Sequence, residues 1–342
     1  MANILILGAG SMGTAFSFPC SDNGHSVSIV GTHLENDFID KINSTKKHPA
    51  LDCEVEKNVK FLKFEKLKEE INKKIDLIVV AVVSKGIEWA SKEITKVLKS
   101  NIPILILTKG LSLNNNNYEV LAHKMERLLK KNGIKETNIS AAGGPCLAKE
   151  LANKAHTSVV FANNDIKVVE QISKLVSTDY YHVSTSNDVI GVETCAAIKN
   201  IFSMAVGASQ GLCDSTKSKE KNYLNTAAAL IQESIYEMII FVEKLKGKKE
   251  TVIGLAGIGD LYVSADGGRN SKMGEYLGQG MKFKEAKKTK MPNITVEGAD
   301  LAIEIGPKVK KDFDSKTLPL MISMIDTICE EKPLKVDWKN FK

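Results

Sequence analysis

The stretch NILILGAGSMG, residues 3–13, joins a short apolar run to glycines at positions 8, 10 and 13. The run is typical of a buried strand, and the residues that follow it are typical of a helix. In such a turn the first glycine permits the tight bend, the second lets backbone approach a pyrophosphate, and the third lets helix and strand pack closely. The helix N-terminus then points amide donors at the phosphates. The stretch therefore predicts a dinucleotide-binding α/β domain.

Two nearby features depart from the standard version of this motif. Pro19 stands where the helix should continue, and an interior proline costs about 3 kcal/mol, so we expect a kink or an early end. The second strand ends in Gly31, Thr32 and His33. It offers neither the acid that holds the ribose of NAD nor the arginine that accepts the extra phosphate of NADP. The choice between the two cofactors is therefore left open.

The rest of the chain divides into two regions with different patterns of predicted secondary structure. Up to about residue 185, helix-like segments alternate with the β-rich runs NILILG, SVSIVG, DLIVVAVV, PILILT, NISAAG, TSVVFA and YYHVS. Such alternation indicates a parallel sheet covered on both faces. Beyond residue 188 helical patterns dominate, notably at 189–213 and 224–246. We predict a Rossmann-like doubly wound domain over 1–188, followed by an all-helical domain over 189–342.

Composition describes an ordinary globular chain. Its 342 residues, 43% apolar and 26% charged, suggest about two domains with a sizeable core. The net charge of +6 comes mostly from lysine clusters, and with 6% aromatic residues there is little case for nucleic acid binding. A mild positive field would instead suit an anionic substrate. The only low-complexity patch, SLNNNN (112–117), is predicted to be a surface loop.

Cysteine and histidine usage bounds the compartment and the chemistry. The six cysteines are scattered singly and we expect no secretory leader, so a reduced, cytoplasmic compartment is predicted. The six histidines form no HExxH and no close cluster, so we predict no metal site. No apolar run approaches the roughly 18 residues that a membrane helix needs, so no membrane span is predicted.

The stretch GVETCAAIKNIFSMAVG, residues 191–207, sets a lysine and an asparagine in an apolar helix. On a helical wheel Glu193, Lys199, Asn200 and Ser203 share one stripe, and the remaining surface is mostly apolar. A charge on a buried helix must find a partner, change its protonation or face a wet cavity. The alternative is a core helix whose lysine extends to the surface. This segment alone does not decide between them.

A set of sequence motifs in a fixed order decides between these two interpretations of Lys199. They are GAGSMGTA (8–15), TKGL (108–111), GGPCLAKEL (143–151), NDVIGVETCAAIKNIFSMAVG (187–207), GLAGIGDL (254–261), GGRN (267–270) and VEG (296–298). Over roughly residues 1–305 the chain resembles the NAD(P)-dependent glycerol-3-phosphate dehydrogenases. The resemblance implies reversible hydride transfer between a nicotinamide and C2 of dihydroxyacetone phosphate. The product, sn-glycerol 3-phosphate, would serve phospholipid synthesis, redox balance or both.

This reaction gives the lysine a purpose. Reducing a ketone needs a proton for the developing alkoxide and a cation near that oxygen. Lys199 matches the family's acid/base lysine, and desolvation with a second ammonium would lower its pKa towards the working pH. Lys109, at the C-terminal end of the strand PILILT, is the expected second ammonium, with a surface lysine as the alternative. Asp260 should orient or charge-balance Lys199, unless it is an ordinary helix cap.

The GGRN motif supplies a receptor for the phosphate of the substrate. Gly267 and Gly268 free the backbone, Arg269 can bind two phosphate oxygens, and Asn270 adds an amide donor. The following segment looks helical, which would put these residues at a positive helix N-terminus. A solvent-exposed turn is the alternative.

The resemblance assigns the remaining contacts. It implies cofactor contacts at Gly8, Gly10, Ser11, Met12, Gly13, His33, Lys109, Ala148, Arg269 and Glu297. It implies substrate contacts at Lys109, Gly144, Cys146, Lys199, Asn200, Asp260, Ser264, Gly268, Arg269 and Asn270. NAD or NADP is the implied cofactor, no metal is implied, and the family often forms homodimers.

Two other functions share part of this pattern. UDP-sugar dehydrogenases carry a similar GGxC motif whose cysteine attacks an aldehyde, and Cys146 departs from the serine usual in glycerol-3-phosphate dehydrogenases. Those enzymes, however, place the lysine helix before the cysteine, whereas Cys146 precedes Lys199 here. A nicotinamide-binding regulator without catalysis would have lost residues at the catalytic positions, which are all present. The basic segment STKSKEKNYL (215–224), longer than expected in the family, is predicted to form a surface loop.

Overall fold

A computed structural model describes residues 1–98, 102–213 and 223–342, so most of the predicted 215–224 loop lies outside the described residues. This part of the chain forms two compact units. The sheet unit comprises Met1–Lys109 and Val120–Val192, and the helical unit comprises Gly110–Glu119 and Glu193–Lys342. The chain passes between the units three times, and the last passage, after Val192, lies close to the predicted boundary near residue 188. The inclusion of Gly110–Glu119 in the helical unit had no signal in the sequence analysis.

The sheet unit is built on eight strands in the order β12-β11-β10-β7-β6-β1-β2-β5. All neighbours are parallel except β10 and β11, which are antiparallel. The strands are β1 (Asn3–Leu7), β2 (Ser26–Val30), β5 (Val59–Leu62), β6 (Leu77–Val80), β7 (Ile104–Ile106), β10 (Ile139–Gly143), β11 (Thr157–Ala162) and β12 (Tyr181–Ser186). The predicted doubly wound, mainly parallel sheet is confirmed. Only β5 escaped prediction, because its sequence, VKFL, is short and interrupted by lysine.

The strand order creates a switch point between β1 and β6. From β1 the chain proceeds to β2 and β5 on one side, whereas β6, β7 and β10 follow on the other side. Because crossover connections are right-handed, this reversal puts the intervening helices on opposite faces of the sheet. Ligands of open α/β sheets bind in the crevice that opens at such a point. The fold thus singles out the loops that follow β1 and β6.

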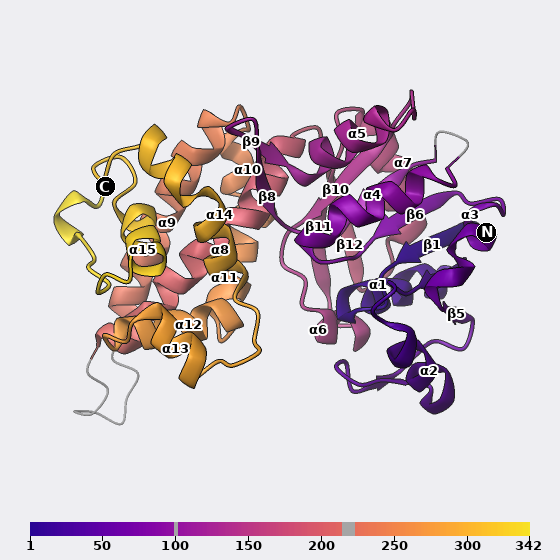
Figure 1. Cartoon of the computed structure of the whole chain (residues 1–342), viewed down its shortest axis with the longest axis horizontal. Helices are drawn as coiled ribbons and strands as arrows, with labels where there is room; N and C mark the ends of the chain where they lie inside the picture. The colour runs from indigo at the N-terminus through magenta and orange to yellow at the C-terminus, as the bar shows by residue number, and fades with distance from the viewer. Residues whose placement is uncertain (99–101, 214–222) are drawn as a thin grey trace. The chain divides into compact units, whose positions relative to one another are not determined.

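Two groups of helices accompany the sheet (Figure 1). Helix α1 (Ser11–Asp22) contacts α6 (Ala148–Ala152) and α7 (Ile166–Val176), while α4 (Ile87–Thr95) contacts α5 (Leu121–Lys131). The smaller elements are α2 (Asn36–Thr45), α3 (Leu67–Ile71), η1 (Phe64–Lys66), η2 (Ser84–Gly86) and the two-stranded pair of β3 (Lys47–His48) with β4 (Cys53–Glu54). The ring of Phe16 on α1 lies 6.4 Å from that of Phe161 and 6.1 Å from that of Tyr181, so α1 packs directly on the sheet.

Helix α1 does not stop at Pro19, so the predicted early end is wrong. The helix runs to Asp22, and the amide of Asn23 still donates to the Pro19 carbonyl at 3.2 Å. Every residue from Gly13 to Ser21 is buried. Packing on nearly all sides therefore offsets the local cost of the proline, in line with the rule that tertiary burial outweighs propensity in protein helices.

The helical unit agrees with the prediction that helices dominate the chain after residue 188. Its helices are α8 (Val189–Leu212, which begins in the sheet unit), α9 (Leu224–Lys244), α10 (Lys249–Val252), η4 (Leu255–Gly259), α11 (Asp260–Ala265), α12 (Arg269–Gly278), α13 (Phe283–Thr289), α14 (Glu297–Asp312), α15 (Pro319–Cys329) and η5 (Trp338–Asn340). Both long predicted helices, at 189–213 and 224–246, are present as α8 and α9. The later part of the chain, coloured orange to yellow in Figure 1, consists of helices joined by loops, with no strand among its described residues.

The predicted surface loop at 112–117 is instead part of a β-hairpin. Strand β8 (Leu111–Asn114) pairs with β9 (Asn117–Val120), and β8 contacts α14. Asn115 and Asn116 form the tip with positive φ angles of 48° and 61°. Two consecutive positive φ values suit the tight turns of hairpins, and asparagine tolerates them. The asparagine run thus encodes a turn between two strands.

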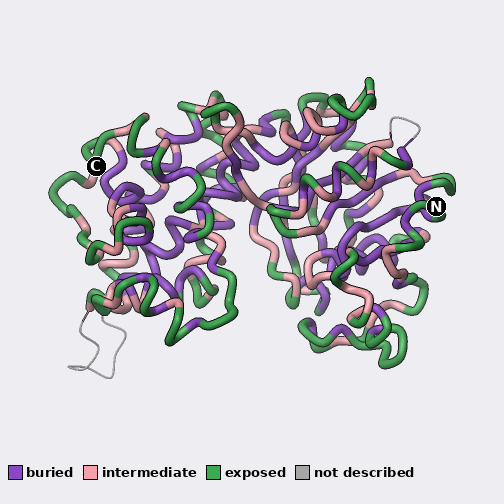
Figure 2. Tube along the Cα trace, in the orientation of Figure 1, coloured by how far each residue is buried: buried purple, intermediate pink, exposed green. Residues whose placement is uncertain are grey.

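Helix α8 is a core helix. By length and composition alone, α8 could cross a membrane, although its sequence contains no uninterrupted apolar run of that length. Of its most apolar 18 residues, however, 89% are buried inside the protein. Figure 2 shows buried residues concentrated in the strands and the central helices. The apolar character of α8 is therefore explained by packing within the protein.

Candidate active site

The glycine turn after β1 has the shape that a dinucleotide phosphate requires. Gly8 has a φ of +109°, and a side chain there would come within 2.7 Å of the Ala81 carbonyl after β6. A side chain at Gly13 would collide with the Gly8 carbonyl, so α1 can approach the turn only with glycine at this position. Gly10 differs, because a Cβ there would meet no atom within 4 Å. The space beside Gly10 is therefore open for a ligand.

The N-terminus of α1 adds donors to this space. Gly10 is the N-cap residue, and no side chain caps the helix. Ser11 and Met12 form the first turn and are partly exposed. Uncapped amides at a helix N-terminus favour an anion through both hydrogen bonding and the helix dipole. The turn at the β1–β6 switch point therefore fits the pyrophosphate of a nicotinamide dinucleotide.

The structure supplies an acid at the end of β2 that the sequence analysis missed. Glu35 is the N-cap residue of α2, and its Oε2 accepts hydrogen bonds from the Thr32 amide at 2.6 Å and the Ala9 amide at 3.3 Å. The prediction that no acid stands at the end of β2 holds for Gly31–His33. In the folded loop, however, Glu35 supplies a carboxylate at this place. The available signal was a glutamate about 20 residues beyond the glycine turn, the usual spacing of the ribose-binding acid.

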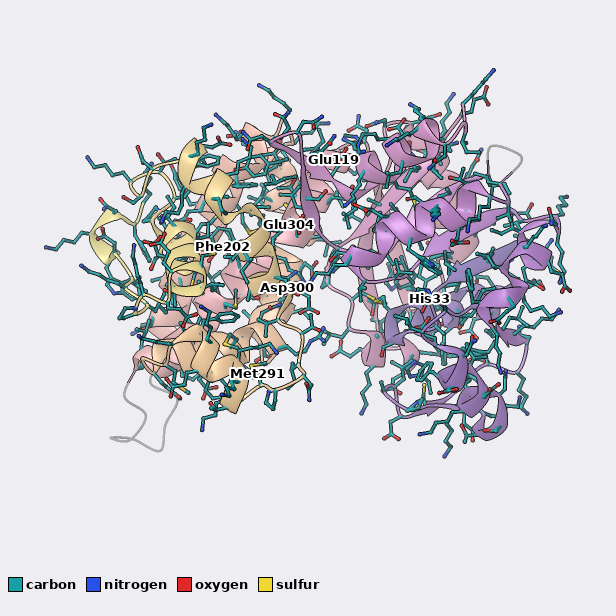
Figure 3. All side chains as sticks on the ribbon, in the orientation of Figure 1. His33, Glu119, Phe202, Met291, Asp300 and Glu304 are labelled. Carbon is teal, nitrogen blue, oxygen red and sulfur yellow. The ribbon has the colours of Figure 1, made fainter. Side chains whose placement is uncertain are left out.

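His33 lies in an aromatic cluster, and Figure 3 labels it on the sheet unit. Its ring centroid is 5.3 Å from that of Trp89 and 6.4 Å from that of Phe64, and the last two are 5.3 Å apart. The three residues follow β2, β5 and β6, whose carboxyl ends lie at one edge of the parallel sheet. Trp89 and Phe64 were not recognised in the sequence, because scattered aromatic residues give no motif.

The loops after β7 and β10 meet through Lys109. Its Nζ donates to the Gly144 carbonyl at 3.1 Å, and Gly144 has a φ of +100° that favours glycine. Cys146 follows, and its half-buried side chain packs against the hydrophobic core and is in no disulfide. Ala148 begins α6. Four residues that the resemblance assigned to substrate or cofactor therefore occupy two adjoining loops of the sheet unit.

Lys199 is buried in the helical unit and is held by two side chains. Its Nζ lies 2.5 Å from Asp260 Oδ1 and 2.5 Å from Ser264 Oγ, and the side chains of Lys199 and Asp260 are 8% and 2% exposed. The alternative of a lysine that extends to the surface is thus wrong. The ion pair expected between Lys199 and Asp260 is present. This contact satisfies both charges in an apolar setting.

The backbone before Asp260 explains why the carboxylate reaches the lysine. Residues Leu255–Gly259 form a π-helical turn directly before α11, and Asp260 is the first residue of α11. A side chain at Gly257 would collide with the Val252 carbonyl, so only glycine permits this close turn. Single π-helical turns occur frequently at functional sites, where they redirect a side chain. The glycines of GLAGIGDL thus set the position of Asp260.

Asn200 and Asn270 form a chain of amide hydrogen bonds. Asn270 Nδ2 donates to Asn200 Oδ1 at 3.0 Å, and its Oδ1 accepts from the Gly298 amide at 2.9 Å. The chain ties α8, α12 and α14 together. Glycine makes the approach possible, because side chains at Gly274 and Gly298 would collide with the backbone of α8. One Nδ2 hydrogen of Asn270 remains for a ligand, since an amide nitrogen carries two.

Arg269 opens α12 and pairs with Glu297, which opens α14. The guanidinium contacts the Glu297 carboxylate, and the side chains are 58% and 40% exposed. Gly268 is the N-cap residue of α12, and Gly267 has a φ of +82° with open space around it. The predicted helix after GGRN is present, with Arg269 and Asn270 in its first turn. An arginine at a positive helix end is well suited to bind phosphate.

The candidate residues therefore form two groups, one in each unit. The cofactor group in the sheet unit holds the glycine turn, Glu35, His33 and the Lys109–Gly144 pair. The substrate group in the helical unit holds Lys199 with Asp260 and Ser264, the Asn200–Asn270 chain and the Arg269–Glu297 pair. Among the described residues, no three His, Cys, Asp or Glu side chains gather as metal ligands would.

The glycine turn at the switch point of a doubly wound sheet is the mark of a dinucleotide-dependent oxidoreductase of the Rossmann type. Two family models narrow this class. The N-terminal model of NAD-dependent glycerol-3-phosphate dehydrogenase matches residues 3–169, and the C-terminal model matches residues 188–337. The chain belongs to the NAD(P)-dependent glycerol-3-phosphate dehydrogenase family.

Individual relatives agree with the family models. The chain is 32% identical over 283 residues to a protein of Archaeoglobus fulgidus named NADP(+)-dependent glycerol-3-phosphate dehydrogenase, which covers 83% of this chain and 82% of that one. It is 31% identical over 291 residues to the glycerol-3-phosphate dehydrogenase [NAD(P)+] of an Exiguobacterium strain, covering 83% and 80%. The crystal structure of glycerol-3-phosphate dehydrogenase from Coxiella burnetii superposes with a TM-score of 0.80 at 25% identity, covering 97% and 96%.

These similarities confirm the activity predicted from the sequence. The chain is an NAD(P)-dependent oxidoreductase that acts on glycerol 3-phosphate and dihydroxyacetone phosphate. Its sheet followed by helices is the architecture of solved enzymes of this family.

Proposed function

We propose that Lys199 is the general acid and base of this reaction, and that Asp260 and Ser264 are its positioning residues. The observation that carries the proposal is the buried contact of the Lys199 ammonium with the Asp260 carboxylate and the Ser264 hydroxyl. These two contacts hold the Lys199 ammonium in a fixed position. General acid catalysis needs a group held within hydrogen-bond reach of the oxygen that receives the proton.

The proposed steps balance as follows. A reduced nicotinamide, when bound, would supply the hydride to C2 of dihydroxyacetone phosphate and become the oxidised form. The carbonyl oxygen gains negative charge as its double bond opens, and Lys199 transfers a proton from Nζ to that oxygen. The product is sn-glycerol 3-phosphate. In the reverse direction Lys199 accepts the proton of the C2 hydroxyl. Lys109 is proposed as a second cation near this oxygen, where charge develops in the transition state.

The phosphate is proposed to bind at the start of α12. Arg269 would bind two phosphate oxygens, and Asn270 would add the Nδ2 hydrogen that Asn200 does not use. The exposure of Arg269 supports this role, since its present partner, Glu297, is itself partly exposed. Gly144, Cys146 and Gly268 are proposed to line the remainder of the substrate site, and Ala148, Arg269 and Glu297 to contact the cofactor. None of these roles requires a metal.

The broader assignment follows from the family. We propose two domains, 1–188 for the cofactor and 189–342 for the substrate, in a cytoplasmic homodimer that supplies glycerol 3-phosphate for phospholipid synthesis, redox balance or both. None of the six cysteines, all of which lie in the described part of the chain, forms a disulfide, which fits a reduced compartment. The family resemblance is the support for the dimer.

The first experiment is a direct assay. Purified protein is mixed with dihydroxyacetone phosphate and either NADH or NADPH, and the loss of reduced nicotinamide absorbance is followed, with UDP-glucose and NAD as the control reaction. We expect rapid oxidation of the reduced nicotinamide in the first mixture and no reduction of NAD to NADH in the control. Folded protein that binds cofactor but oxidises neither NADH nor NADPH would refute the proposed mechanism.

A further inference from the structure

The loop between β2 and α2 folds Glu35 back onto the glycine turn. Oε2 of Glu35 accepts from the amides of Thr32 and Ala9, which fixes the carboxylate beside the residue between Gly8 and Gly10. Gly31 makes this possible, because a Cβ there would lie 3.3 Å from Glu35 Cβ and 3.0 Å from Ile39 Cγ1. Oε1 makes no hydrogen bond within the described part of the chain. Glu35 therefore presents one fixed carboxylate oxygen that can still accept a donor.

His48 adds a second observation at the same place. Its Nδ1 accepts from the Ala50 and Leu51 amides, both at 3.2 Å, so the proton lies on Nε2. The side chain is buried, and Nε2 has no hydrogen-bond partner that meets normal geometry. The backbone of Ala9 and the Glu35 carboxylate are close enough to affect its pKa, but burial dominates and lowers that pKa. His48 therefore lies beside the Glu35 loop as a neutral side chain and adds no positive charge next to the carboxylate.

The surrounding charges matter for the ribose of the cofactor. NAD carries a hydroxyl on C2′ of its adenosine ribose, whereas NADP carries a phosphate there. A carboxylate at the end of the second strand accepts from the hydroxyl, and an arginine accommodates the phosphate. The chain has only two arginines, Arg127 and Arg269, and neither lies near residues 30–50 in the sequence. Lys41, Lys46 and Lys47, all exposed, are the lysines of this segment, and the last two directly precede His48 in the sequence.

We propose that Glu35 accepts the 2′-hydroxyl of the adenosine ribose and makes this enzyme selective for NAD(H) over NADP(H). The proposal rests on the proposed function only in placing a dinucleotide at the glycine turn. A 2′-phosphate would place its negative charge next to the fixed Glu35 carboxylate, and neighbouring like charges repel each other.

The test uses cofactor fragments that cannot react. ADP-ribose and 2′-phospho-ADP-ribose are titrated into the purified full-length protein by calorimetry, because they differ only at the 2′ position and need no catalysis. We expect ADP-ribose to bind about 10- to 100-fold more tightly, the usual worth of a hydrogen bond to a charged group. Equal affinities, or tighter binding of the 2′-phosphorylated compound, would overturn the proposal and turn attention to Lys46 and Lys47.

Variants locate the effect at one side chain. Glu35→Gln removes the charge and should bring the two affinities within a few-fold of each other. Glu35→Asp keeps the charge on a shorter side chain, so it should still reject the 2′-phosphate even if the loop shifts. Asp37→Asn is the matched control, because it removes an exposed carboxylate two positions away and should leave the affinity ratio unchanged. An unchanged ratio in folded Glu35→Gln would overturn the proposal.

Kinetics then separate this proposal from the proposed function. The ratio of kcat/KM for NADH to kcat/KM for NADPH, measured with dihydroxyacetone phosphate, should fall in Glu35→Gln mainly through a higher KM for NADH. Fragment selectivity in a protein without dehydrogenase activity would preserve the role of Glu35 and refute the mechanism. Activity with equal use of both cofactors would preserve the mechanism and refute the role of Glu35.

Discussion

Lys199 and Asp260 form a buried ion pair in the helical unit, with Nζ 2.5 Å from Oδ1 and neither side chain more than 8% exposed. Removing one member of such a pair leaves an uncompensated buried charge, at a cost of about 3–5 kcal/mol. Any substitution here thus acts on stability as well as on chemistry. The experiments must separate these two effects.

Replacing Lys199 tests the acid. Lys199→Ala removes the group that we propose protonates the alkoxide, so turnover should fall by about 10²- to 10⁴-fold. The measurement is kcat for dihydroxyacetone phosphate at saturating cofactor, with circular dichroism to establish folding. Lys310→Ala is the control, because it removes an exposed lysine of α14 from its ion pair with Asp326 of α15 and should leave kcat unchanged. Near wild-type turnover in folded Lys199→Ala would exclude the proposed role.

Replacing Asp260 tests whether the carboxylate acts through the lysine. Asp260→Asn should lower kcat in the wild-type background but change it little in the Lys199→Ala background, because a positioning residue has no effect without its partner. Stability should behave in the opposite way: Asp260→Asn should raise the Tm of Lys199→Ala by removing the lone buried charge. A double-mutant cycle of kcat and Tm measures both. Additive losses in kcat would show that Asp260 acts independently.

Replacing Arg269 tests the phosphate site. Arg269→Ala should reduce discrimination between dihydroxyacetone phosphate and dihydroxyacetone by about 10- to 100-fold, since a charged hydrogen-bond pair is lost. The readout is the ratio of the two kcat/KM values. Arg127→Ala, which changes the only other arginine, on α5 of the sheet unit, should preserve the ratio. Full discrimination in Arg269→Ala would move the phosphate site elsewhere.

The sequence was most informative where motif spacing determines local backbone. The glycines of the first turn, the lysine on α8 and the GGRN motif were predicted with their elements, because each depends on residues close in the sequence. Their partners were predictable only where a motif contained them, as GLAGIGDL contains Asp260. The lysine's expected pKa decrease stays a prediction.

Other features depend on contacts that local sequence does not specify. Glu35 reaches the glycine turn only because the loop after β2 turns back, and the sequence gives no measure of that turn. Pro19 is tolerated because α1 is buried on nearly all sides, which is a tertiary effect. Trp89 and Phe64 meet His33 although the three residues lie in segments that follow three different strands of the sheet. Such groupings become visible only when the strand order is known.

A buried carboxyl predicts how stability depends on pH. Glu237 on α9 accepts hydrogen bonds from the Leu320 and Met321 amides at the start of α15, at 2.5 and 2.8 Å. Burial raises its pKa to about 8, against the effect of these hydrogen bonds and with a further contribution from Glu233. The folded protein thus keeps a proton that the unfolded chain releases above about pH 4.5.

The sign of the effect follows from this difference. The stabilising contribution of Glu237 is complete below pH 4.5 and is lost as pH rises through about 8, so the free energy of unfolding should fall across this window by a few kcal/mol. Glu237→Gln carries no charge and should lack this loss, whereas Glu243→Gln, an exposed change on the same helix, should follow the wild type. Chemical denaturation at several pH values measures the free energy of unfolding of each variant. Parallel curves for wild type and Glu237→Gln would contradict the prediction.

The two tryptophans of the chain provide a matched test of the aromatic cluster. Trp89 lies 5.3 Å from both His33 and Phe64, beside the loop that holds Glu35, so the adenine of the cofactor is expected to stack there. Trp338 lies in the helical unit, 5.1 Å from Phe341 and 46% exposed. Trp89→Ala should raise the KM for the reduced cofactor roughly 5- to 100-fold, the usual worth of base stacking, with little change in kcat. Trp338→Ala should change neither. Equal effects of both substitutions would show that loss of a large side chain, and not loss of stacking, is responsible.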